Sequence, residues 1–209
     1  MSAQQKHGVI SCLPKSSDPT TPADFRPITL LNTDYKIMVR VIVNRLRPMM
    51  EVILHPSQYC GVPGRTIFEA MATVREAISQ TEVTRMPLSL DFQVAFNRIS
   101  YQYLFTTLRS YGFADCFVVR IKSMYEEAAS SFQINGHVSG PIPIHSPVRQ
   151  GCPISMLLFV LCVDQLFSIL DRELTGIRIG KRSRKTVVVA YADNITIFFD
   201  DFDGRTCHK

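Results

Sequence analysis

Two short apolar runs near the C-terminal end of the chain constrain its fold more than any other feature. Residues 186–190 and 195–199 are rich in β-branched and aromatic side chains, and the four residues YADN (191–194) separate them. This pattern predicts a β-hairpin with its turn at Asp193-Asn194. Because both strands are so apolar, we expect the hairpin to lie against the core, with its polar tip at the core's edge.

Helices and further hairpins alternate along the rest of the chain. A short strand is predicted over residues 86–92, and Asn135-Gly136 predicts the turn of a hairpin within residues 131–147. Residues 14–28 are rich in Pro, Ser, Thr and Asp and predict a loop or the tip of an irregular hairpin. The mixed order favours an α+β fold over a regular βαβ winding. A helix is predicted over about 34–52, where Ile37, Met38, Val41, Ile42 and Leu46 fall at helical spacing and Pro48 could kink the end. A second helix is predicted over 66–79, with a Thr66–Glu69 capping box. Three more helices are predicted over 101–112, 115–127 and 153–173.

Composition narrows the function classes only a little. The 209 residues are 46% hydrophobic and 20% charged, which suffices for one sizeable core or two small subdomains that share one. A net charge of +5 fits a polyanionic partner without singling one out. The six cysteines form no CxxC pair and no histidine cluster accompanies them, so a zinc site and a disulfide framework are not expected.

Nothing in the sequence predicts secretion or membrane insertion. The N-terminal residues are polar and unlike a signal peptide. The most apolar run, 154–162, is followed by Asp164 and is too short to span a bilayer. We therefore expect an intracellular protein, in the nucleus or cytoplasm, with no membrane partner, and the sequence leaves its oligomeric state open.

Two aspartates are the first candidates for chemistry. Asp91 ends the strand predicted over residues 86–92, and Asp193 lies in the predicted hairpin turn. Taken singly, each has an ordinary explanation, as a solvated strand-terminal acid and as a common turn residue. If the two strands are neighbours, both carboxylates meet at one edge, which is what a two-magnesium clamp on phosphate oxygens requires.

A third segment, PVRQGCPISMLLF (147–159), joins a polar loop to an apolar helix. Arg149 and Gln150 precede Gly151, which permits close approach of the backbone to a ligand. The segment could touch a nucleotide or a template strand. An ordinary helix start with a proline in its first turn explains the same residues.

Together with FRPITLLNTDYKI (25–37), LHPSQYCGVPGRTI (54–67), LSLDFQVAFNRIS (88–100) and YADN, this segment resembles the successive blocks of the reverse transcriptase domain of non-LTR (LINE-type) retrotransposons. The blocks occur in the family's order and cover about residues 8–200. The resemblance implies the fingers and palm of a right-hand polymerase, with an antiparallel palm sheet and packed helices. It further implies a fingers-like segment over 1–85, a palm over 86–209, and a chain that stops before the family's thumb.

The same resemblance implies an RNA-directed DNA polymerase that uses an RNA template, a DNA primer, deoxynucleoside triphosphates and two Mg²⁺ ions, with Mn²⁺ as an alternative. Asp91, the carbonyl of Phe92 and Asp193 resemble metal ligands. Phe96 resembles the aromatic gate that excludes a ribose 2′-hydroxyl, and the alternative is a core phenylalanine. Residues expected to contact the nucleotide or template are Lys15, Arg26, Arg149, Gln150, Gly151 and Tyr191, of which Lys15 is equally explained as a solvated lysine.

Three positions depart from the family's pattern. Asn194, Gln93 and Asn97 carry amides where the family usually has acids. Asn194 matters most, because it stands beside Asp193 in the catalytic block, so we count it with Asp91 and Asp193 as catalytic. An amide oxygen can ligate Mg²⁺ but brings no charge. The alternatives are therefore a catalytically degenerate fragment with at most nucleic-acid binding, or an α+β interaction module whose acids lie far apart.

Overall fold

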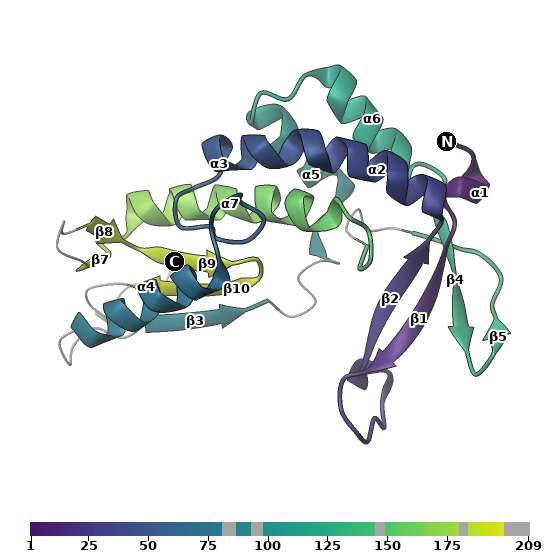
Figure 1. Ribbon diagram of the computed structural model, residues 1–209, viewed down its shortest axis with the longest axis horizontal. Helices are drawn as coiled ribbons and strands as arrows, with labels where there is room; N and C mark the ends of the chain where they lie inside the picture. The colour runs from purple at the N-terminus through teal and green to yellow at the C-terminus, as the bar shows by residue number, and fades with distance from the viewer. Residues whose placement is uncertain (81–86, 93–97, 145–148, 180–183, 199–209) are drawn as a thin grey trace, which may run out of the picture. The chain divides into compact units, whose positions relative to one another are not determined.

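The computed structural model describes residues 1–80, 87–92, 98–144, 149–179 and 184–198 (Figure 1). The chain divides into two compact units, each built from two stretches of sequence. The first unit comprises Met1–Leu46 and Val94–Cys162, and the second comprises Arg47–Gln93 and Val163–Lys209. The predicted division at residue 85 into fingers-like and palm segments concerns functional roles and stays a prediction.

The first unit contains a five-stranded sheet in the order β2-β1-β4-β5, with β6 also paired to β4. β1 (Gly8–Pro14) is antiparallel to β2 (Phe25–Leu31) and parallel to β4 (Ala129–Ile134). β5 (His137–Val138) follows β4 through the predicted turn, where Asn135 and Gly136 have φ of 50° and 80°. Positive φ at both central residues fits a type I′ turn, so the predicted hairpin is confirmed. The short elements of this unit are α1 (Ala3–Lys6), η1 (Pro22–Asp24) and β6 (Ile142–Pro143).

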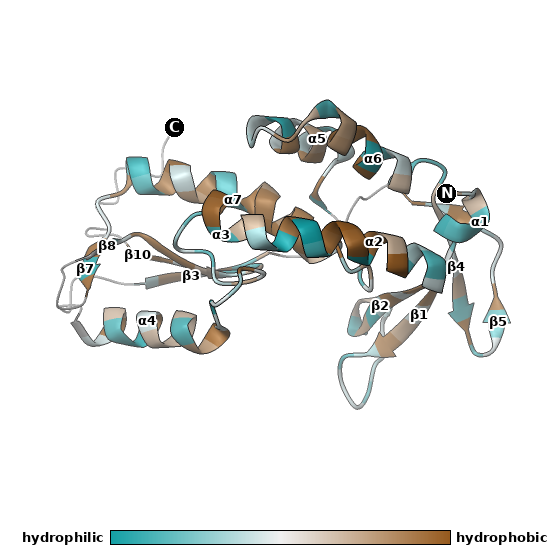
Figure 2. Cartoon of the chain, turned by 45° about the horizontal axis from the view of Figure 1, so that its top comes forward, coloured by the Kyte–Doolittle hydropathy of each residue, from teal (hydrophilic) through white to brown (hydrophobic). Residues whose placement is uncertain are grey.

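Helices α2 (Thr33–Leu46), α5 (Tyr101–Ser110) and α6 (Asp115–Tyr125) belong to the first unit. α7 (Ser155–Glu173) contributes its first half to this unit and its second half to the other. α2 buries Tyr35, Val39, Val43 and Leu46, at near four-residue spacing. Ile37 and Met38, which helped to predict the helix, are instead 60% and 52% exposed. The periodicity thus located the helix but not its buried face, because apolar residues occur on both faces (Figure 2).

The second unit is a three-layer arrangement around an antiparallel sheet in the order β3-β10-β9. Its strands are β3 (Pro87–Asp91), β9 (Val188–Tyr191) and β10 (Asn194–Phe198). One face packs on α7, where Phe167 meets Val188, Ala190, Ile195 and Ile197. The other face packs on α4 (Ile67–Gln80), where Ala70 and Ala77 meet Val189 and Phe198 (Figure 1). The small elements η2 (Arg47–Met49), α3 (Met50–Ile53), β7 (Ile177–Ile179) and β8 (Arg184–Thr186) complete the unit.

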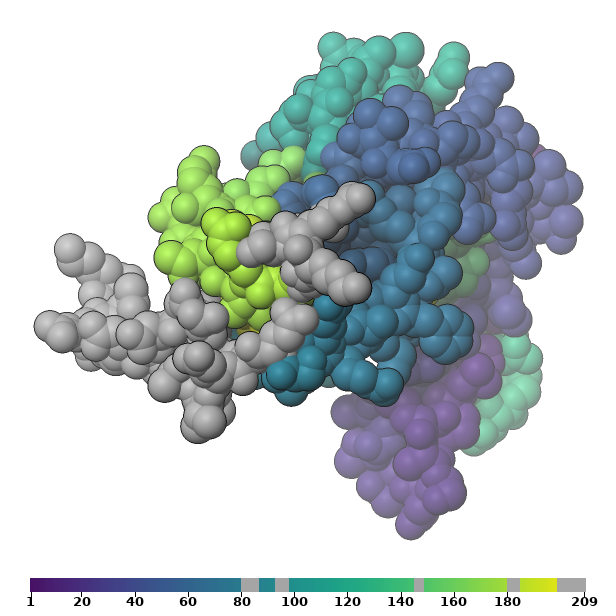
Figure 3. Space-filling model, turned by 60° about the vertical axis from the view of Figure 1, so that its left-hand side comes forward, coloured from purple at the N-terminus to yellow at the C-terminus, as the bar shows by residue number. Residues whose placement is uncertain are grey.

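Alternation along the hairpin explains why both of its faces are covered. Ile195 and Ile197 point to the α7 side, whereas Val189 and Phe198 point to the α4 side. Figure 3 shows the surface of this unit, with α4 in blue and the second half of α7 in green. In the described residues, none of the helices is long and apolar enough to cross a membrane.

Truncating Phe167 tests the layer between α7 and the hairpin. Phe167 is fully buried and its ring also meets His55 edge to face at 6.2 Å. We expect Phe167→Ala to lower the free energy of unfolding by about 3–5 kcal/mol, since it leaves a cavity in this core. Ile169→Ala on the same helix is the control, because Ile169 is 47% exposed and its truncation should cost less than about 0.5 kcal/mol. Urea denaturation measures both, and equal losses would contradict this packing.

Candidate active site

Strand pairing in the second unit brings the candidate acids to one edge of the sheet. Asp91 is the last residue of β3 and pairs with Asn194, the first residue of β10. Asn194 also pairs with Tyr191, the last residue of β9. Directly opposed residues of antiparallel strands have Cβ atoms ~4.5–5.5 Å apart and share one face. Asp91 therefore lies beside the turn that carries Asp193, and its side chain shares a face with that of Asn194.

The turn itself lies one residue earlier than the sequence predicted. Ala192 and Asp193 are its central residues, and Asn194 has already entered the β10 ladder. Ala192 has a φ of 56°, in the left-handed region that glycine favours. The prediction of a turn at Asp193-Asn194 was therefore wrong by one position. The pairing with Asp91 and the burial of Ile195 toward α7 set the actual register.

A loop between α3 and α4 supports this hairpin. Gln58 forms an isolated parallel bridge with Ala190, in which the Ala190 amide donates to the carbonyl of Ser57 and the Tyr59 amide donates to the carbonyl of Ala190, both at 2.9 Å. Sequence reasoning assigned no role to Gln58 or to its bridge with Ala190. The available signal was the block LHPSQYCGVPGRTI, whose residues surround the bridge.

The thiol of Cys60 lies next to the turn and stays neutral. Burial raises its pKa most, the nearby Tyr191 hydroxyl opposes this by hydrogen bonding, and the Asp193 carboxylate raises it further. Because the thiol carries no charge at neutral pH, it neither repels nor compensates the carboxylate. Cys60 therefore adds no charge to this edge of the sheet.

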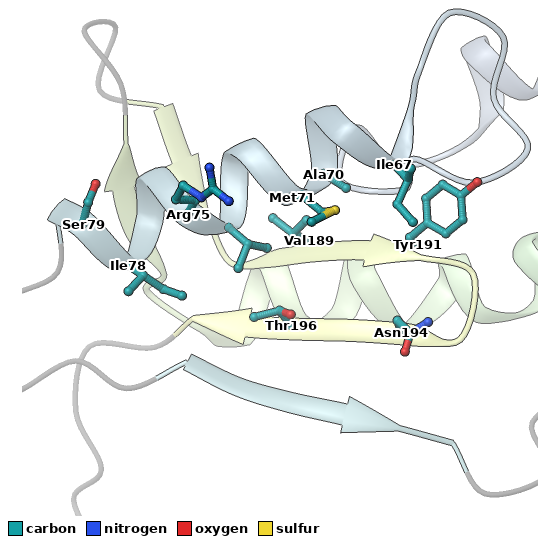
Figure 4. A pocket seen from close by; sticks show the side chains of 11 residues that line it. Ile67, Ala70, Met71, Arg75, Ile78, Ser79, Val189, Tyr191, Asn194 and Thr196 are labelled. Carbon is teal, nitrogen blue, oxygen red and sulfur yellow. The ribbon is translucent and has the colours of Figure 1, made fainter. Parts of the chain in front are cut away.

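An apolar cavity of about 600 Å³ adjoins the edge, between α4 and the sheet (Figure 4). Tyr191, Asn194 and Thr196 line it from the strands, so it begins at the candidate site. Met71 and Ile78 of α4 are 55% and 53% exposed there. The other lining residues are Ile67, Ala70, Val74, Arg75, Ser79 and Val189.

The two candidate phosphate-binding cations lie on one hairpin of the first unit. Arg26 is exposed on β2 and pairs with Leu13, and Lys15 immediately follows β1. The Lys15 ammonium donates to the Ala23 carbonyl at 2.8 Å. Hydrogen bonds from the backbone and side chain of Thr21 hold the pKa of the Asp24 carboxyl below its usual value, so Asp24 stabilises this hairpin tip. Both cations are thus held at the same end of the hairpin.

The segment 149–151 is docked on β2 rather than open to solvent. The Arg149 guanidinium is buried, stands 5.8 Å from the ring centres of both Tyr35 and Tyr125, and donates to the Lys6 carbonyl at 3.0 Å. The Thr29 amide donates to the Gln150 carbonyl at 2.8 Å. A contact of Arg149 with a nucleotide stays a prediction, and it would require this buried side chain to be uncovered.

Gly151 approaches β2 more closely than any other residue type could. It has a φ of 103°, and a Cβ at this position would lie 2.4 Å from the Thr29 carbonyl oxygen. The close approach expected of this glycine is therefore to the chain's own backbone. Phe92 directly follows β3 and is 38% exposed. Phe96, Gln93 and Asn97 lie outside the described residues.

The donor set at the sheet edge fits magnesium. Two carboxylates and an amide oxygen are hard ligands, and Mg²⁺ is commonly bound by one or two protein carboxylates together with water and substrate phosphates. Elsewhere in the ranges that the structure describes, no three His, Cys, Asp or Glu side chains are grouped to hold a metal ion, and the edge itself has only two acids. Asn194 stands where a third carboxylate would complete such a group.

Comparison with known proteins agrees with this geometry. Residues 13–208 match the family model described as reverse transcriptase (RNA-dependent DNA polymerase). A "Transposon TX1 uncharacterized 149 kDa protein" from Xenopus laevis is 36% identical over 199 residues, which cover 94% of this chain and 15% of that protein. A "Retrovirus-related Pol polyprotein from type-1 retrotransposable element R2" from Popillia japonica is 26% identical, over 90% of this chain and 27% of its own. The chain thus spans less than a third of either relative.

The fold also resembles a solved structure of apo telomerase from Candida tropicalis. The TM-score is 0.64 at 11% sequence identity, over 96% of this chain and 40% of the telomerase chain. At this identity the likeness concerns the fold alone.

Adding a methyl group at Gly151 tests the docking of the 149–151 segment. We expect Gly151→Ala to lower the free energy of unfolding by about 1–3 kcal/mol, because the new Cβ overlaps the Thr29 carbonyl and the backbone has a positive φ. Gly140→Ala is the control, since a Cβ there meets nothing within 4 Å and should cost less than about 0.5 kcal/mol. Thermal or urea unfolding measures both variants. A Gly151→Ala chain as stable as the Gly140→Ala chain would contradict the close approach.

Proposed function

The chain belongs to the reverse transcriptase (RNA-dependent DNA polymerase) family, as a domain of the non-LTR retrotransposon kind, and on this premise we propose that it is an RNA-directed DNA polymerase domain. It would extend a DNA primer on an RNA template with deoxynucleoside triphosphates. The observation that carries the proposal is the pairing of Asp91 with Asn194, which places two carboxylates at one edge of the palm-like sheet. A location inside the cell accords with the five free cysteines of the described residues.

In the proposed reaction the primer 3′-hydroxyl oxygen loses its proton to solvent and bonds to the α-phosphorus of the nucleotide, and the bond to the departing pyrophosphate breaks. Asp91, Asp193 and the carbonyl of Phe92 would hold two Mg²⁺ ions, or Mn²⁺ in their place. Bound metal supplies charge neutralisation on the phosphate oxygens and activation of the attacking hydroxyl. The chain's own contribution would be to fix its ligands at the end of β3 and in the adjoining turn, where the sheet limits their movement.

Other residues would position the nucleotide. Lys15 and Arg26, held at one hairpin end, would bind the triphosphate, since a guanidinium fork can hold two phosphate oxygens. Phe96 would exclude a ribose 2′-hydroxyl. Tyr191 lines the sheet face beside Asn194, where it would contact the incoming nucleotide. Arg149, Gln150 and Gly151 would shape the template side through their attachment to β2.

Asn194 favours a second candidate, a domain that binds nucleic acid and polymerises slowly or not at all. The amide keeps the ladder pairing with Asp91 and Tyr191 but removes one negative charge from the metal site. A unit charge ~4 Å from a cation is worth roughly 4 kcal/mol at an effective dielectric of 20, before screening by ions and phosphates. Nucleic-acid binding would persist, because it depends on the cations rather than on the acids.

Restoring the missing carboxylate separates the two candidates. We expect Asn194→Asp to increase Mg²⁺-dependent primer extension on an RNA template by about tenfold or more, since even a well-screened charge strengthens metal binding. Asp91→Ala in the Asn194→Asp background is the control and should abolish extension. The measurement is the initial rate of labelled nucleotide incorporation at several Mg²⁺ and Mn²⁺ concentrations. Equal rates with and without the Asn194→Asp change would refute the role given to this position.

A further inference from the structure

Gln58 is a fully buried side chain that touches the turn of the candidate site. Its Oε1 atom accepts two hydrogen bonds, from the Cys60 amide at 2.9 Å and from the Ala192 amide at 3.2 Å. Ala192 immediately precedes Asp193 in the turn. One side-chain carbonyl therefore joins the supporting loop to the backbone beside a candidate metal ligand, across 134 positions of sequence.

The Ala192 amide belongs to a backbone conformation that needs support. With a φ of 56°, Ala192 occupies the left-handed region, where the side chain of an L-residue is crowded by its own backbone. Strain of this kind persists only where the surroundings over-determine the conformation. Ala192 is buried, and the hydrogen bond from its amide to Gln58 is the contact that ties this strained residue to the loop.

The loop that carries Gln58 is itself fastened to α7. The His55 amide donates to Asp164 Oδ1 at 2.9 Å, and His55 Nε2 lies 2.8 Å from Asp171 Oδ2. The Ser57 amide donates to His55 Nδ1 at 3.2 Å, so Nδ1 is an acceptor and Nε2 carries the proton toward Asp171. The loop is thus anchored to the helix that packs under the sheet.

Arg65 closes the same loop from its other end. Its Nη1 atom donates to the carbonyls of Gln58 at 2.6 Å and of His55 at 3.1 Å. With this guanidinium bonded to loop carbonyls, the backbone of Gln58 is held on both sides: by Arg65 and by the bridge to Ala190. The Gln58 side chain therefore projects from a fixed backbone, which a positioning element requires.

We propose that Gln58 is a positioning residue for the proposed polymerase reaction: its side-chain carbonyl holds Ala192 in the left-handed conformation and thereby fixes Asp193 for metal binding. The inference rests on the proposed function for its catalytic consequence, but the hydrogen bond and its effect on the turn stand independently. Gln58 acts only as an acceptor among the described residues, because its Oε1 atom accepts from two backbone amides and its Nε2 atom has no hydrogen-bond partner there. The plainer explanation is that Gln58 only closes its own loop through the Cys60 amide.

Three variants of the full chain separate these explanations. Gln58→Met keeps the length of the side chain but removes the acceptor. Gln58→Glu keeps an acceptor oxygen at the same reach. Tyr59→Phe is the matched control: it removes the 3.1 Å hydrogen bond between the hydroxyl of Tyr59 in the same loop and that of Thr73 on α4, and it leaves Ala192 untouched. The readouts are hydrogen exchange of the Ala192 amide by NMR, Mn²⁺ affinity by electron paramagnetic resonance, and kcat and KM for nucleotide in primer extension.

We expect Gln58→Met to speed exchange of the Ala192 amide roughly tenfold, which corresponds to the loss of one ordinary hydrogen bond. Mn²⁺ affinity and kcat should fall with it, more than KM changes. Gln58→Glu should restore slow exchange, and Tyr59→Phe should leave all three readouts as in the wild-type chain. Unchanged Ala192 exchange and Mn²⁺ affinity in Gln58→Met would overturn the proposal.

The wild-type chain provides a test that does not depend on a variant folding. The Ala192 and Cys60 amides share one acceptor, so both should be protected from exchange, and the Ala192 amide should show a scalar coupling to the Gln58 side-chain carbonyl. A fast-exchanging Ala192 amide beside a protected Cys60 amide would favour the loop-closing explanation. Absence of primer extension in a wild-type chain whose Ala192 amide is protected would instead count against the proposed function. It would not contradict the hydrogen bond between the Ala192 amide and the Gln58 side chain.

Discussion

The antiparallel pairing of β10 with β3 is the constraint on which the candidate site depends. Ile195 and Ile197 must face α7, and a slip of one residue would turn both of them toward the opposite face. The register is therefore fixed by burial of apolar side chains, at positions that take no part in the chemistry. In this register Asp91 pairs with Asn194 in the strand ladder, and the turn with Asp193 lies beside Asp91. The hydrophobic core of the second unit thus places the two acids.

The two faces of the β3-β10-β9 sheet are packed differently. On the α7 side the core is continuous from Phe167 to the strands, which makes that face a rigid support. On the α4 side the packing of Val189 and Phe198 gives way to a cavity near Asn194 and Tyr191. The side chains of Tyr191 and Asn194 consequently border a cavity on this face instead of a packed core. This difference explains how β10 can contribute buried side chains to the core and a polar side chain, Asn194, to the candidate site.

The sequence correctly predicted structural features that depend on interactions between residues close together in the chain. The Thr66–Glu69 capping box is confirmed, with the Thr66 amide donating to the Glu69 carboxylate at 2.8 Å. The Asn135-Gly136 turn is confirmed as well, and the helix expected to kink near Pro48 ends at Leu46 and continues as η2 and α3. The α+β class with an antiparallel sheet and packed helices is also confirmed, together with the right-hand polymerase fold. The capping box and the turn depend on hydrogen bonds or dihedral preferences within a few residues.

Features decided by distant residues were missed. The sequence around β1 (Gly8–Pro14) does not predict that this strand pairs in parallel with β4, more than 100 positions away. The hairpin turn was placed one residue late, because its position depends on the pairing with β3 and on the amide of Ala192 bonding to Gln58. The buried face of α2 was not identified, since Ile37 and Val39 are equally apolar and only the tertiary fold distinguishes them. The exact position of each residue at the candidate site therefore depends on pairing between distant strands, which the order of the sequence motifs does not reveal.

Asn194 shows that fold and chemistry at this edge are separable. Its backbone maintains the ladder with Asp91 and Tyr191 as any residue would, and its exposed side chain adds nothing to the core. An amide in place of a carboxylate at this position costs the fold little, and the Cys60 thiol, which stays protonated, does not supply the missing charge. The architecture of this edge is therefore compatible with a weakened metal site, because the forces that assemble the edge are apolar and those that would bind a metal ion are electrostatic.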